Sequence, residues 1–154
     1  MTALFVPDET AMLALGERLA QAIVRNQSKG CNIYLIGDLG AGKTTLTRGL
    51  LHGLGHKGAV KSPTFTLVEP YELGEVRAFH FDLYRLSDPE ELEYIGIRDY
   101  FAAGHVTLVE WPDKGAGVLP PADITITIQY RDKGREVSLA AHSVQGQSIV
   151  DQLS

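Results

Sequence analysis

Hydrophobic side chains change their spacing along the chain, and each spacing predicts a different kind of element. Between residues 12 and 24 they recur every three or four positions, with polar residues between them, which predicts an amphipathic helix. Asp8, Glu9 or Thr10 would cap the start of this helix by offering a side-chain oxygen to its first N–H groups. The polar and glycine-containing segment 26–30 would end it.

The next stretch predicts a strand, a glycine loop and a second helix. Residues 32–36 form an apolar run that is too short for a helix and leads straight into glycines, so they predict a buried strand. Leucines at helical spacing then predict a helix that begins at Lys43 and stops at the glycines of segment 53–58.

Two later stretches have the composition of β-hairpins. Each has two runs rich in β-branched and aromatic residues around a polar turn. The predicted strands are residues 64–71 and 76–83 around a turn at 72–75, and residues 124–130 and 136–140 around a turn at 132–134. Between the hairpins, Ser87 and Glu90 have the spacing of a capping box, with Pro89 in the first turn of a short helix. Residues 106–110 predict another strand, and no element is predicted in the tail after His142.

Helices and strands that alternate around a glycine loop predict an α/β fold of the P-loop NTPase type. Because two hairpins accompany the other strands, we expect three layers in which helices flank a mixed central sheet. The length of 154 residues suits a single domain over 1–154, and 44% hydrophobic with 21% charged residues is ordinary for a soluble protein.

Charge and cysteine content exclude several classes of function. A formal net charge of −5 leaves no excess of cations to follow a phosphate backbone, so we expect no direct, stand-alone binding of nucleic acid. Cys31 is the only cysteine and predicts a buried structural residue in a reducing compartment. The chain has no run of about 18 apolar residues and no signal-like start, so we expect a cytoplasmic protein without a membrane partner.

The glycine loop carries the strongest chemical signal. Residues 37–44, GDLGAGKT, match the P-loop pattern G-x-x-x-x-G-K-[ST] at every position, between a predicted strand and a predicted helix. Inward-facing N–H groups and the helix start would bind phosphate oxygens, Lys43 would add a mobile charge, and Thr44 would be a ligand of Mg²⁺. The residues predicted to bind the nucleotide here are Asp38, Leu39, Gly40, Ala41, Gly42, Lys43, Thr44 and Thr45.

Carboxylates end two of the predicted strands. Asp82 and Glu110 would face the nucleotide, where either could hold Mg²⁺ or polarise a water; the alternative for each is a capping or solvated carboxylate. His80 and His105 lie in or open strands without a visible partner, so we interpret both as structural.

Other side chains leave two interpretations open. Arg85 and Arg98 could reach charge that develops on a phosphoryl group, and surface ion pairs with nearby acidic residues explain them equally well. Arg85 is the better candidate because it follows Asp82 closely. Trp111, followed by Pro112, belongs either to the core or to a contact with a ligand or partner.

Five segments in this order resemble the TsaE family, the P-loop ATPase subunit of the bacterial machinery for tRNA threonylcarbamoyladenosine biosynthesis. The resemblance covers nearly the whole chain and is more specific than a P-loop alone. Its segments are GDLGAGKTT at 37–45, SPTFTLVEPY at 62–71, HFDLYRL at 80–86, DPEELEYIGIRDYF at 88–101 and VEWPDKG at 109–115.

The resemblance implies ATP hydrolysis with Mg²⁺ as the cofactor ion. It implies that Lys43 contacts the phosphates, that Thr44 and Glu110 bind Mg²⁺, and that Asp82 lies near the γ-phosphate or its water. It further implies that segment 62–66 is a switch that senses the nucleotide.

The resemblance also implies where adenosine and the partners bind. Pro7 and Glu9, with Gly134 and Arg135, would border the adenosine, although spacing alone indicates ordinary surface. The family acts with the TsaB and TsaD proteins, of which TsaD transfers the threonylcarbamoyl group to tRNA. Binding of tRNA would therefore be indirect, through the complex.

Other functions share parts of this pattern. A small-molecule kinase would have a P-loop and a similar length, but it should carry an arginine-rich lid, and the arginines after the loop are scattered singly. A GTPase should have an N-K-x-D segment, which the sequence lacks. A third possibility is a binding module that a nucleotide switches between two states.

Overall fold

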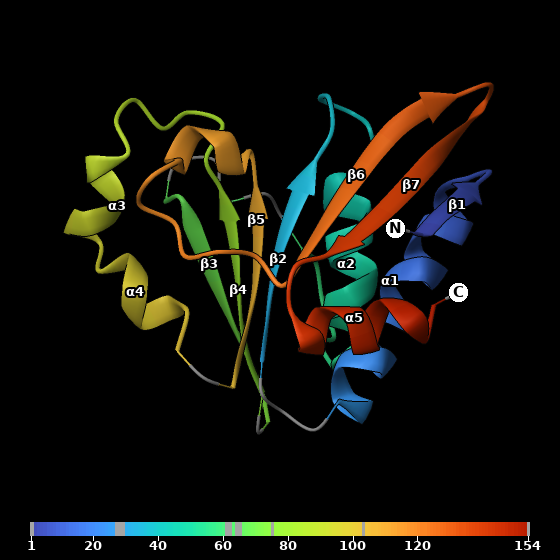
Figure 1. Cartoon of the computed structure of the whole chain (residues 1–154), viewed down its shortest axis with the longest axis horizontal. Helices are drawn as coiled ribbons and strands as arrows, with labels where there is room; N and C mark the ends of the chain where they lie inside the picture. The colour runs from blue at the N-terminus through green and yellow to red at the C-terminus, as the bar shows by residue number, and fades with distance from the viewer. Residues whose placement is uncertain are drawn as a thin grey trace.

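The structure is a computed structural model that describes residues 2–26, 30–60, 63, 66–74, 76–102 and 104–153. Within these residues one seven-stranded sheet runs through the molecule in the order β1-β7-β6-β2-β5-β4-β3 (Figure 1). Its strands are β1 (Thr2–Val6), β2 (Cys31–Ile36), β3 (Val68–Leu73), β4 (Val76–Asp82), β5 (His105–Glu110), β6 (Ile124–Arg131) and β7 (Gly134–Ala141).

The sheet is mixed, as the hairpins predict. The four central strands β6, β2, β5 and β4 are parallel, and their apolar runs are buried between layers of helix. The outer strands β1, β7 and β3 join by antiparallel pairing. Because the central strands are parallel, their carboxyl ends meet at one edge of the sheet.

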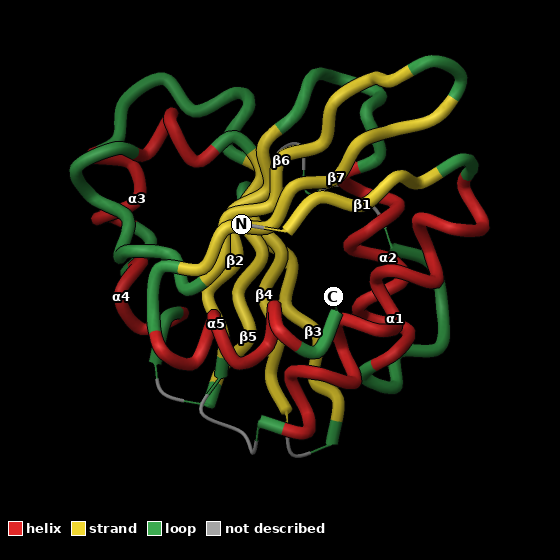
Figure 2. The backbone as a smooth tube through the Cα atoms, turned by 45° about the vertical axis from the view of Figure 1, so that its right-hand side comes forward, coloured by secondary structure: helices red, strands yellow, loops and turns green. Residues whose placement is uncertain are grey.

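Helices cover both faces of the sheet, which confirms the predicted three layers. Figure 2 shows α1 and α2 on one side and α3 and α4 on the other. The larger core cluster contains side chains of α1, α2 and α5, and the smaller one contains side chains of α3 and α4. The helices are α1 (Glu9–Arg25), α2 (Lys43–Gly53), α3 (Glu90–Tyr94), α4 (Ile97–Tyr100) and α5 (Val144–Asp151), with a 3₁₀ helix η1 (Pro112–Gly115).

The starts of the two long helices agree with the sequence. Asp8 is the N-cap of α1, and its Oδ1 accepts a hydrogen bond of 2.8 Å from the backbone N–H of Ala11. α2 begins at Lys43, directly after Gly42 with its φ of 118°. The helices pack closely, because a Cβ on Gly16 of α1 would lie 2.5 Å from the carbonyl oxygen of Leu46 in α2. α1 therefore supports the helix that follows the glycine loop.

The predicted hairpins form, with shifted boundaries. The first strand begins at Val68 instead of residue 64, after Leu67 with its φ of 68°, and it continues to Leu73. Residues 64, 65 and 75 of that prediction lie outside the described residues. Most of the predicted switch at 62–66 lies outside them too. In the second hairpin β6 and β7 extend to Arg131 and Gly134, which face each other across a two-residue turn.

The predicted capping box at Ser87 and Glu90 is wrong. Oε2 of Glu91 accepts hydrogen bonds of 2.9 and 3.0 Å from the backbone N–H groups of Ser87 and Asp88, while Glu90 is the first residue of α3. Pro89 is the N-cap instead of a first-turn residue. The helix starts later than predicted, so the carboxylate one residue further on reaches back to the preceding loop.

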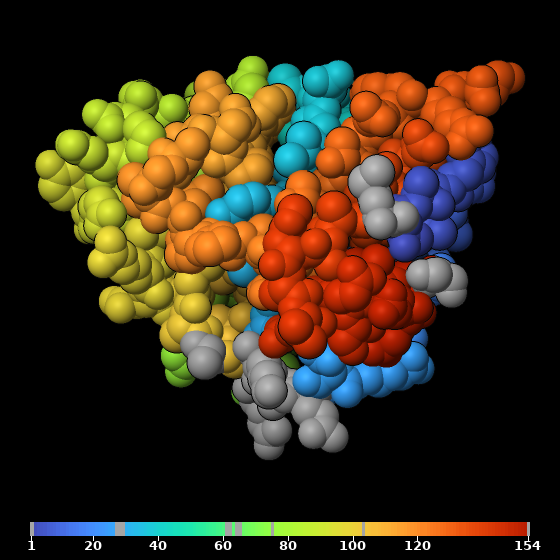
Figure 3. Space-filling view, viewed as in Figure 1, coloured from blue at the N-terminus to red at the C-terminus, as the bar shows by residue number. Residues whose placement is uncertain are grey.

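Four elements were not predicted: β1, α4, η1 and α5. Among the described strands β1 is an edge strand that pairs only with β7, and α5 occupies the tail after His142, where no element was expected. Figure 3 shows this C-terminal segment, in red, packed between the orange β6–β7 hairpin and the blue α1. Ser143 is the N-cap of α5, and its Oγ accepts a hydrogen bond of 2.9 Å from the backbone N–H of Gly146. The same hydroxyl donates a hydrogen bond of 2.8 Å to Oδ1 of Asp123. No helix in the described ranges is long and apolar enough to cross a membrane.

Candidate nucleotide site

The glycine loop lies at the edge where the parallel strands end. It connects the end of β2 to the start of α2, and Gly40 and Gly42 have φ values of 80° and 118°, which side-chain-bearing residues rarely adopt. In the register of β4 and β5, Asp82 lies opposite Glu110. The structure thus brings the loop and both predicted carboxylates to one edge.

Two cavities meet at the loop. The Trp111 cavity, of about 430 Å³, lies between the loop and the ends of β4 and β5. Its lining residues are Leu39, Gly40, Gly42, Lys43, Thr44, Thr45, Asp82, Tyr84, Arg85, Glu110 and Trp111. The hairpin cavity, of about 380 Å³, lies between the loop, the segment before α1 and the β6–β7 turn. Its lining residues are Val6, Pro7, Asp8, Glu9, Met12, Gly40, Ala41, Gly42, Thr45, Lys133, Gly134 and Arg135.

Lys43 is buried in the Trp111 cavity. Its Nζ donates a 2.6 Å hydrogen bond to the carbonyl oxygen of Gly37 and lies 3.8 Å from the ring centroid of Trp111. The side chain keeps a cation against an aromatic face and a loop carbonyl, which are both favourable partners for its charge. A phosphate group in the cavity would offer it a stronger, anionic acceptor.

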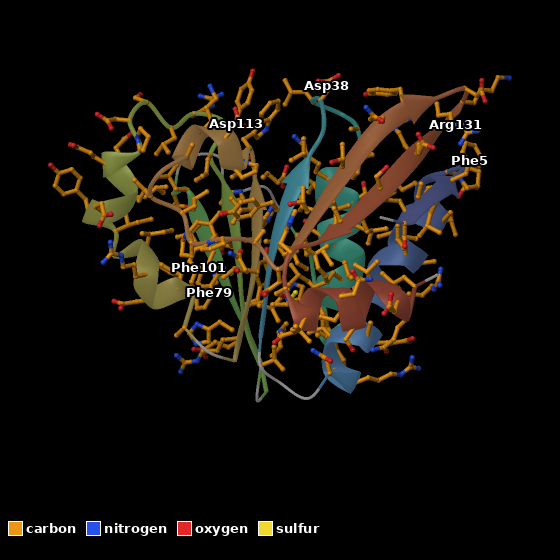
Figure 4. The ribbon with its side chains drawn as sticks, viewed as in Figure 1. Phe5, Asp38, Phe79, Phe101, Asp113 and Arg131 are labelled. Carbon is orange, nitrogen blue, oxygen red and sulfur yellow. The ribbon has the colours of Figure 1, made fainter. Side chains whose placement is uncertain are left out.

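Burial lowers the pKa of Lys43 below that of an ordinary lysine. Four carboxylates, of Glu110, Asp82, Asp38 and Asp113, oppose this shift by stabilising the ammonium. Figure 4 shows Asp38 and Asp113 at the same edge of the sheet, on the loop after β2 and on η1. The surroundings of the lysine are thus strongly acidic.

Thr44 and Glu110, which the family resemblance implies as ligands of Mg²⁺, lie within hydrogen-bonding distance of each other. Thr44 Oγ1 donates to Oε2 of Glu110 at 3.3 Å, and Glu110 is only 3% exposed. His80 is fully buried and places its Nε2 2.6 Å from the same Oε2, so the interpretation that His80 lacks a partner is wrong. The spacing of His80 and Asp82 indicates that both lie on one face of the strand, and the register of β4 on β5 then brings His80 to Glu110.

Asp82 and Trp111 complete this side of the loop. Oδ1 of Asp82 accepts a 3.0 Å hydrogen bond from the backbone N–H of Tyr84. Trp111 has a φ of 58°, which is uncommon for a residue with a side chain, and this turn places its ring over Lys43 and 5.0 Å from the ring of Tyr84. Of its two interpretations, the structure favours a place in the site wall.

The β6–β7 hairpin contacts the loop from the other side. Arg135 Nε donates to the carbonyl oxygen of Ala41 at 3.0 Å, and Tyr130 donates its hydroxyl to the carbonyl oxygen of Leu39 at 3.3 Å. The guanidinium of Arg135 lies 4.1 Å from the centroid of the Tyr130 ring. Gly134 is required here, because a Cβ would lie 2.7 Å from the carbonyl oxygen of Val6.

Most predicted site residues line one of the two cavities. Pro7, Glu9 and Gly134, which come from distant parts of the chain, share the hairpin cavity with the loop. Glu9 forms an ion pair of 2.6 Å with Arg48. Asp38 lies apart, in a separate hollow of about 130 Å³ that Trp111 also lines.

His105 and Arg98 line neither cavity. Nδ1 of His105 lies 3.2 Å from the carbonyl oxygen of Tyr100, and its ring is close to Phe79. Arg98 lies on α4, on the opposite face of the sheet from the loop helix, whereas Arg85 lines the Trp111 cavity. Of the two arginines, only Arg85 is in a position to meet a ligand there.

The donor set fits the groups that the sequence implies. A magnesium ion prefers oxygen ligands and keeps several waters, so two protein oxygens beside a phosphate would suffice. The hydroxyl of Thr44 and the carboxylate of Glu110 already lie together. Phosphates fit the floor of the Trp111 cavity. There the N-terminus of α2, a helix of eleven residues, lies together with its first side chain, Lys43.

Comparison with known proteins shows which family the chain resembles. The family described as "Threonylcarbamoyl adenosine biosynthesis protein TsaE" matches residues 6–137. The tRNA threonylcarbamoyladenosine biosynthesis protein TsaE of Haemophilus influenzae is 51% identical over 97% of this chain and 96% of its own. The protein of the same name from Bacillus subtilis is 37% identical over 96% of this chain and 89% of its own.

This chain belongs to the TsaE family. A solved structure, that of Bacillus subtilis YdiB, superposes with a TM-score of 0.80 and 30% sequence identity over 99% of this chain and 93% of that chain. The names of these relatives place the TsaE family in the biosynthesis of threonylcarbamoyladenosine in tRNA.

Proposed function

We propose that this protein binds ATP with Mg²⁺ and hydrolyses it in support of tRNA N6-threonylcarbamoyladenosine biosynthesis, together with TsaB and TsaD proteins. The observation that carries the proposal is the convergence of Lys43, Thr44, Asp82 and Glu110 around one cavity beside the P-loop. The names of the family's members support the tRNA modification as the process that this ATPase serves.

Each residue has a task that follows from its surroundings. Lys43 supplies a positive charge to the β- and γ-phosphates, and Thr44 and Glu110 provide oxygen ligands for the cation. Held by these two residues, a Mg²⁺ ion would supply positive charge to the phosphate oxygens. Asp82, half-buried at the end of β4, orients the attacking water or accepts its proton.

The hairpin cavity is the place for the adenosine. It adjoins the Trp111 cavity through Gly40, Gly42 and Thr45, so a ligand whose phosphates lie on the loop extends into it. Pro7 and Gly134 would flank the nucleoside, and Arg135 would remain on the loop carbonyl.

The proposal includes partner proteins because the domain is acidic and because its hydrolysis of ATP alone is expected to be slow. At a net charge of −5 the protein is poorly suited to bind tRNA, so tRNA would act through the complex. A transition-state charge supplied from outside a domain is worth about 10³ to 10⁵ in rate. TsaB and TsaD would complete the site or order its walls.

The decisive experiment measures the steady-state ATPase activity of the isolated protein and of the protein with TsaB and TsaD. A second measurement tests direct binding of tRNA to the isolated protein. We expect slow hydrolysis alone, faster hydrolysis with the partners, and no tight tRNA binding without them. Lys43→Ala should abolish hydrolysis and weaken ATP binding, whereas Lys57→Ala, an exposed lysine outside both cavities, should match the wild type. Normal turnover in Lys43→Ala, or phosphoryl transfer to a small acceptor in place of hydrolysis, would contradict the proposal.

A further inference from the structure

We infer that His80 is a positioning residue that holds the carboxylate of Glu110 in the orientation needed for cation binding. The inference rests on the proposed function, in which Glu110 is a ligand of Mg²⁺. His80 itself lines neither cavity and would touch neither the nucleotide nor the cation.

The geometry places His80 directly behind Glu110. In the sheet His80 lies opposite Leu108, so its side chain reaches diagonally to Glu110, two residues further along β5. The distance from Nε2 to Oε2 is 2.6 Å, and the two side chains are 0% and 5% exposed. A short hydrogen bond between two buried groups on rigid strands leaves the carboxylate little freedom.

The same carboxylate oxygen is held from two directions. Thr44 Oγ1, at the start of α2, donates to Oε2 of Glu110 at 3.3 Å, while His80 approaches it from β4. Contacts from two elements set the rotamer of Glu110 before any ligand arrives. Histidine and carboxylate partners behind a metal ligand commonly have this effect, and their loss weakens metal affinity or activity about 10- to 100-fold.

The unpaired ring nitrogen identifies the tautomer. Within the described residues Nδ1 of His80 is buried without a hydrogen-bond partner. If Nδ1 carried a proton, a buried N–H donor would be unsatisfied, and the bond to an ionised Glu110 would lose its donor unless the ring were a cation. The arrangement is satisfied best by a neutral ring that carries its proton on Nε2 and donates it to the carboxylate.

The test compares three substitutions at His80. His80→Ala removes the donor, His80→Asn places its amide near the position of Nδ1 and cannot reach Glu110, and His80→Gln places its amide nitrogen near the position of Nε2. The readout is the Mg²⁺ concentration that gives half-maximal binding of a fluorescent ATP analogue. We expect about a tenfold increase for His80→Ala and His80→Asn, and a value near wild type for His80→Gln.

His105→Ala is the matched control. It removes a partly buried histidine from the neighbouring strand, at the end remote from the loop, so it should lower the melting temperature without changing the Mg²⁺ requirement. If His80→Ala fails to fold, the comparison of Asn with Gln still decides. Equal Mg²⁺ requirements in His80→Asn and His80→Gln, whether raised or unchanged from the wild type, would overturn the inference.

A second readout uses the metal-free protein. Long-range ¹H–¹⁵N spectra should show His80 with a protonated Nε2 and a bare Nδ1, and Glu110→Gln should shift the Nε2 resonance. Protonation on Nδ1 alone would overturn the inference. Failure of the proposed function looks different, because then the wild-type protein itself would show no Mg²⁺-dependent ATP binding.

Discussion

At the residue scale, the two carboxylates at the strand ends have different surroundings. Glu110 is buried and receives a hydroxyl and an imidazole on one oxygen, whereas Asp82 is half-buried and accepts from the backbone of the following turn. A tightly held oxygen suits a cation ligand, and a more accessible one suits work on a water molecule.

This difference predicts separate kinetic effects. Glu110→Ala should raise the Mg²⁺ requirement for hydrolysis by more than about tenfold, because a direct ligand is lost. Asp82→Ala should lower kcat by roughly 10² to 10⁴ and leave the Mg²⁺ requirement close to wild type. Glu93→Ala removes an exposed carboxylate of α3 outside both cavities, and it serves as the control in a titration of ATPase rate against Mg²⁺. The same Mg²⁺ dependence in both site variants would remove this division of tasks.

Cys31 illustrates what burial does to a thiol. Burial raises its pKa far above the ordinary range, with a smaller contribution in the same direction from the negative charge of Asp123. Because only the thiolate reacts, the folded protein should resist alkylation by iodoacetamide at pH 8.5.

Mass spectrometry before and after denaturation gives the comparison. Since Cys31 is the only cysteine, every adduct reports on it, and unfolding should convert negligible labelling to complete labelling. The raised pKa of Cys31 also makes the free energy of unfolding depend on pH. Its contribution to stability is fully present below the ordinary thiol pKa and is lost as the pH rises through the pKa of the folded state. Rapid labelling of the native protein would show that the thiol is accessible.

At the element scale, the β6–β7 hairpin acts as a support for the P-loop. Its contacts are made to carbonyl oxygens of Leu39 and Ala41, and in a trans peptide the following N–H points the opposite way. These N–H groups belong to Gly40 and Gly42, which line both cavities. Holding the carbonyls therefore fixes the direction of two donors in the loop.

Removal of this support should weaken nucleotide binding. Arg135→Ala loses a charged hydrogen bond to the loop, and we expect about tenfold weaker ATP binding, equivalent to roughly 1.4 kcal/mol. The control is Arg131→Ala on the same hairpin, whose side chain pairs with Glu136 and lies near Phe5, away from the loop (Figure 4). Calorimetric titration with ATP measures both. Equal affinities for the two variants would show that the contact does not organise the loop.

Elements with a local cause could be predicted from the sequence, and those with a distant cause could not. α1, α2, β2 and β5 follow from apolar spacing, glycine positions and a cap within a few residues. β1 depends on pairing with β7, whose partner residues lie 129 to 137 positions later in the chain, and α5 depends on Ser143, which is held by Asp123.

The same division holds for the site. The glycine loop is contiguous, so the places of Lys43 and Thr44 could be predicted directly, and the places of Asp82 and Glu110 at the same edge followed from their strand ends. The link from His80 to Glu110 needed the register of β4 on β5, which one sequence does not give. The hairpin contacts of Arg135 and Tyr130 to the loop likewise join residues about 90 positions apart in the chain.

At the scale of the whole molecule, the site lies beside both the parallel central strands of the sheet and the antiparallel strands at its N-terminal edge. The central strands bring the loop, Asp82 and Glu110 to one edge, and the outer strands add the walls of the hairpin cavity. Residues from both sides of β2 in the sheet order therefore surround the same loop, since β1 leads into Pro7 and β4 ends at Asp82.

The position of β1 has a consequence for backbone hydrogen exchange. As an edge strand with one neighbour, β1 should open without unfolding of the rest, and its amides should exchange fast in the free protein. The chain directly after it lines the hairpin cavity, so ATP with Mg²⁺ at 100 times its Kd would stabilise the closed strand by up to about 2.7 kcal/mol.

The opposite edge provides the internal reference. β3 is also an edge strand, and none of its residues lines either cavity, so its amides should exchange at the same rate with and without nucleotide. Exchange measured by mass spectrometry should therefore slow at the N-terminal edge and stay constant at the other. Equal slowing of both edges would mean that the nucleotide tightens the entire sheet, and no slowing of β1 would place the nucleoside away from the N-terminal segment.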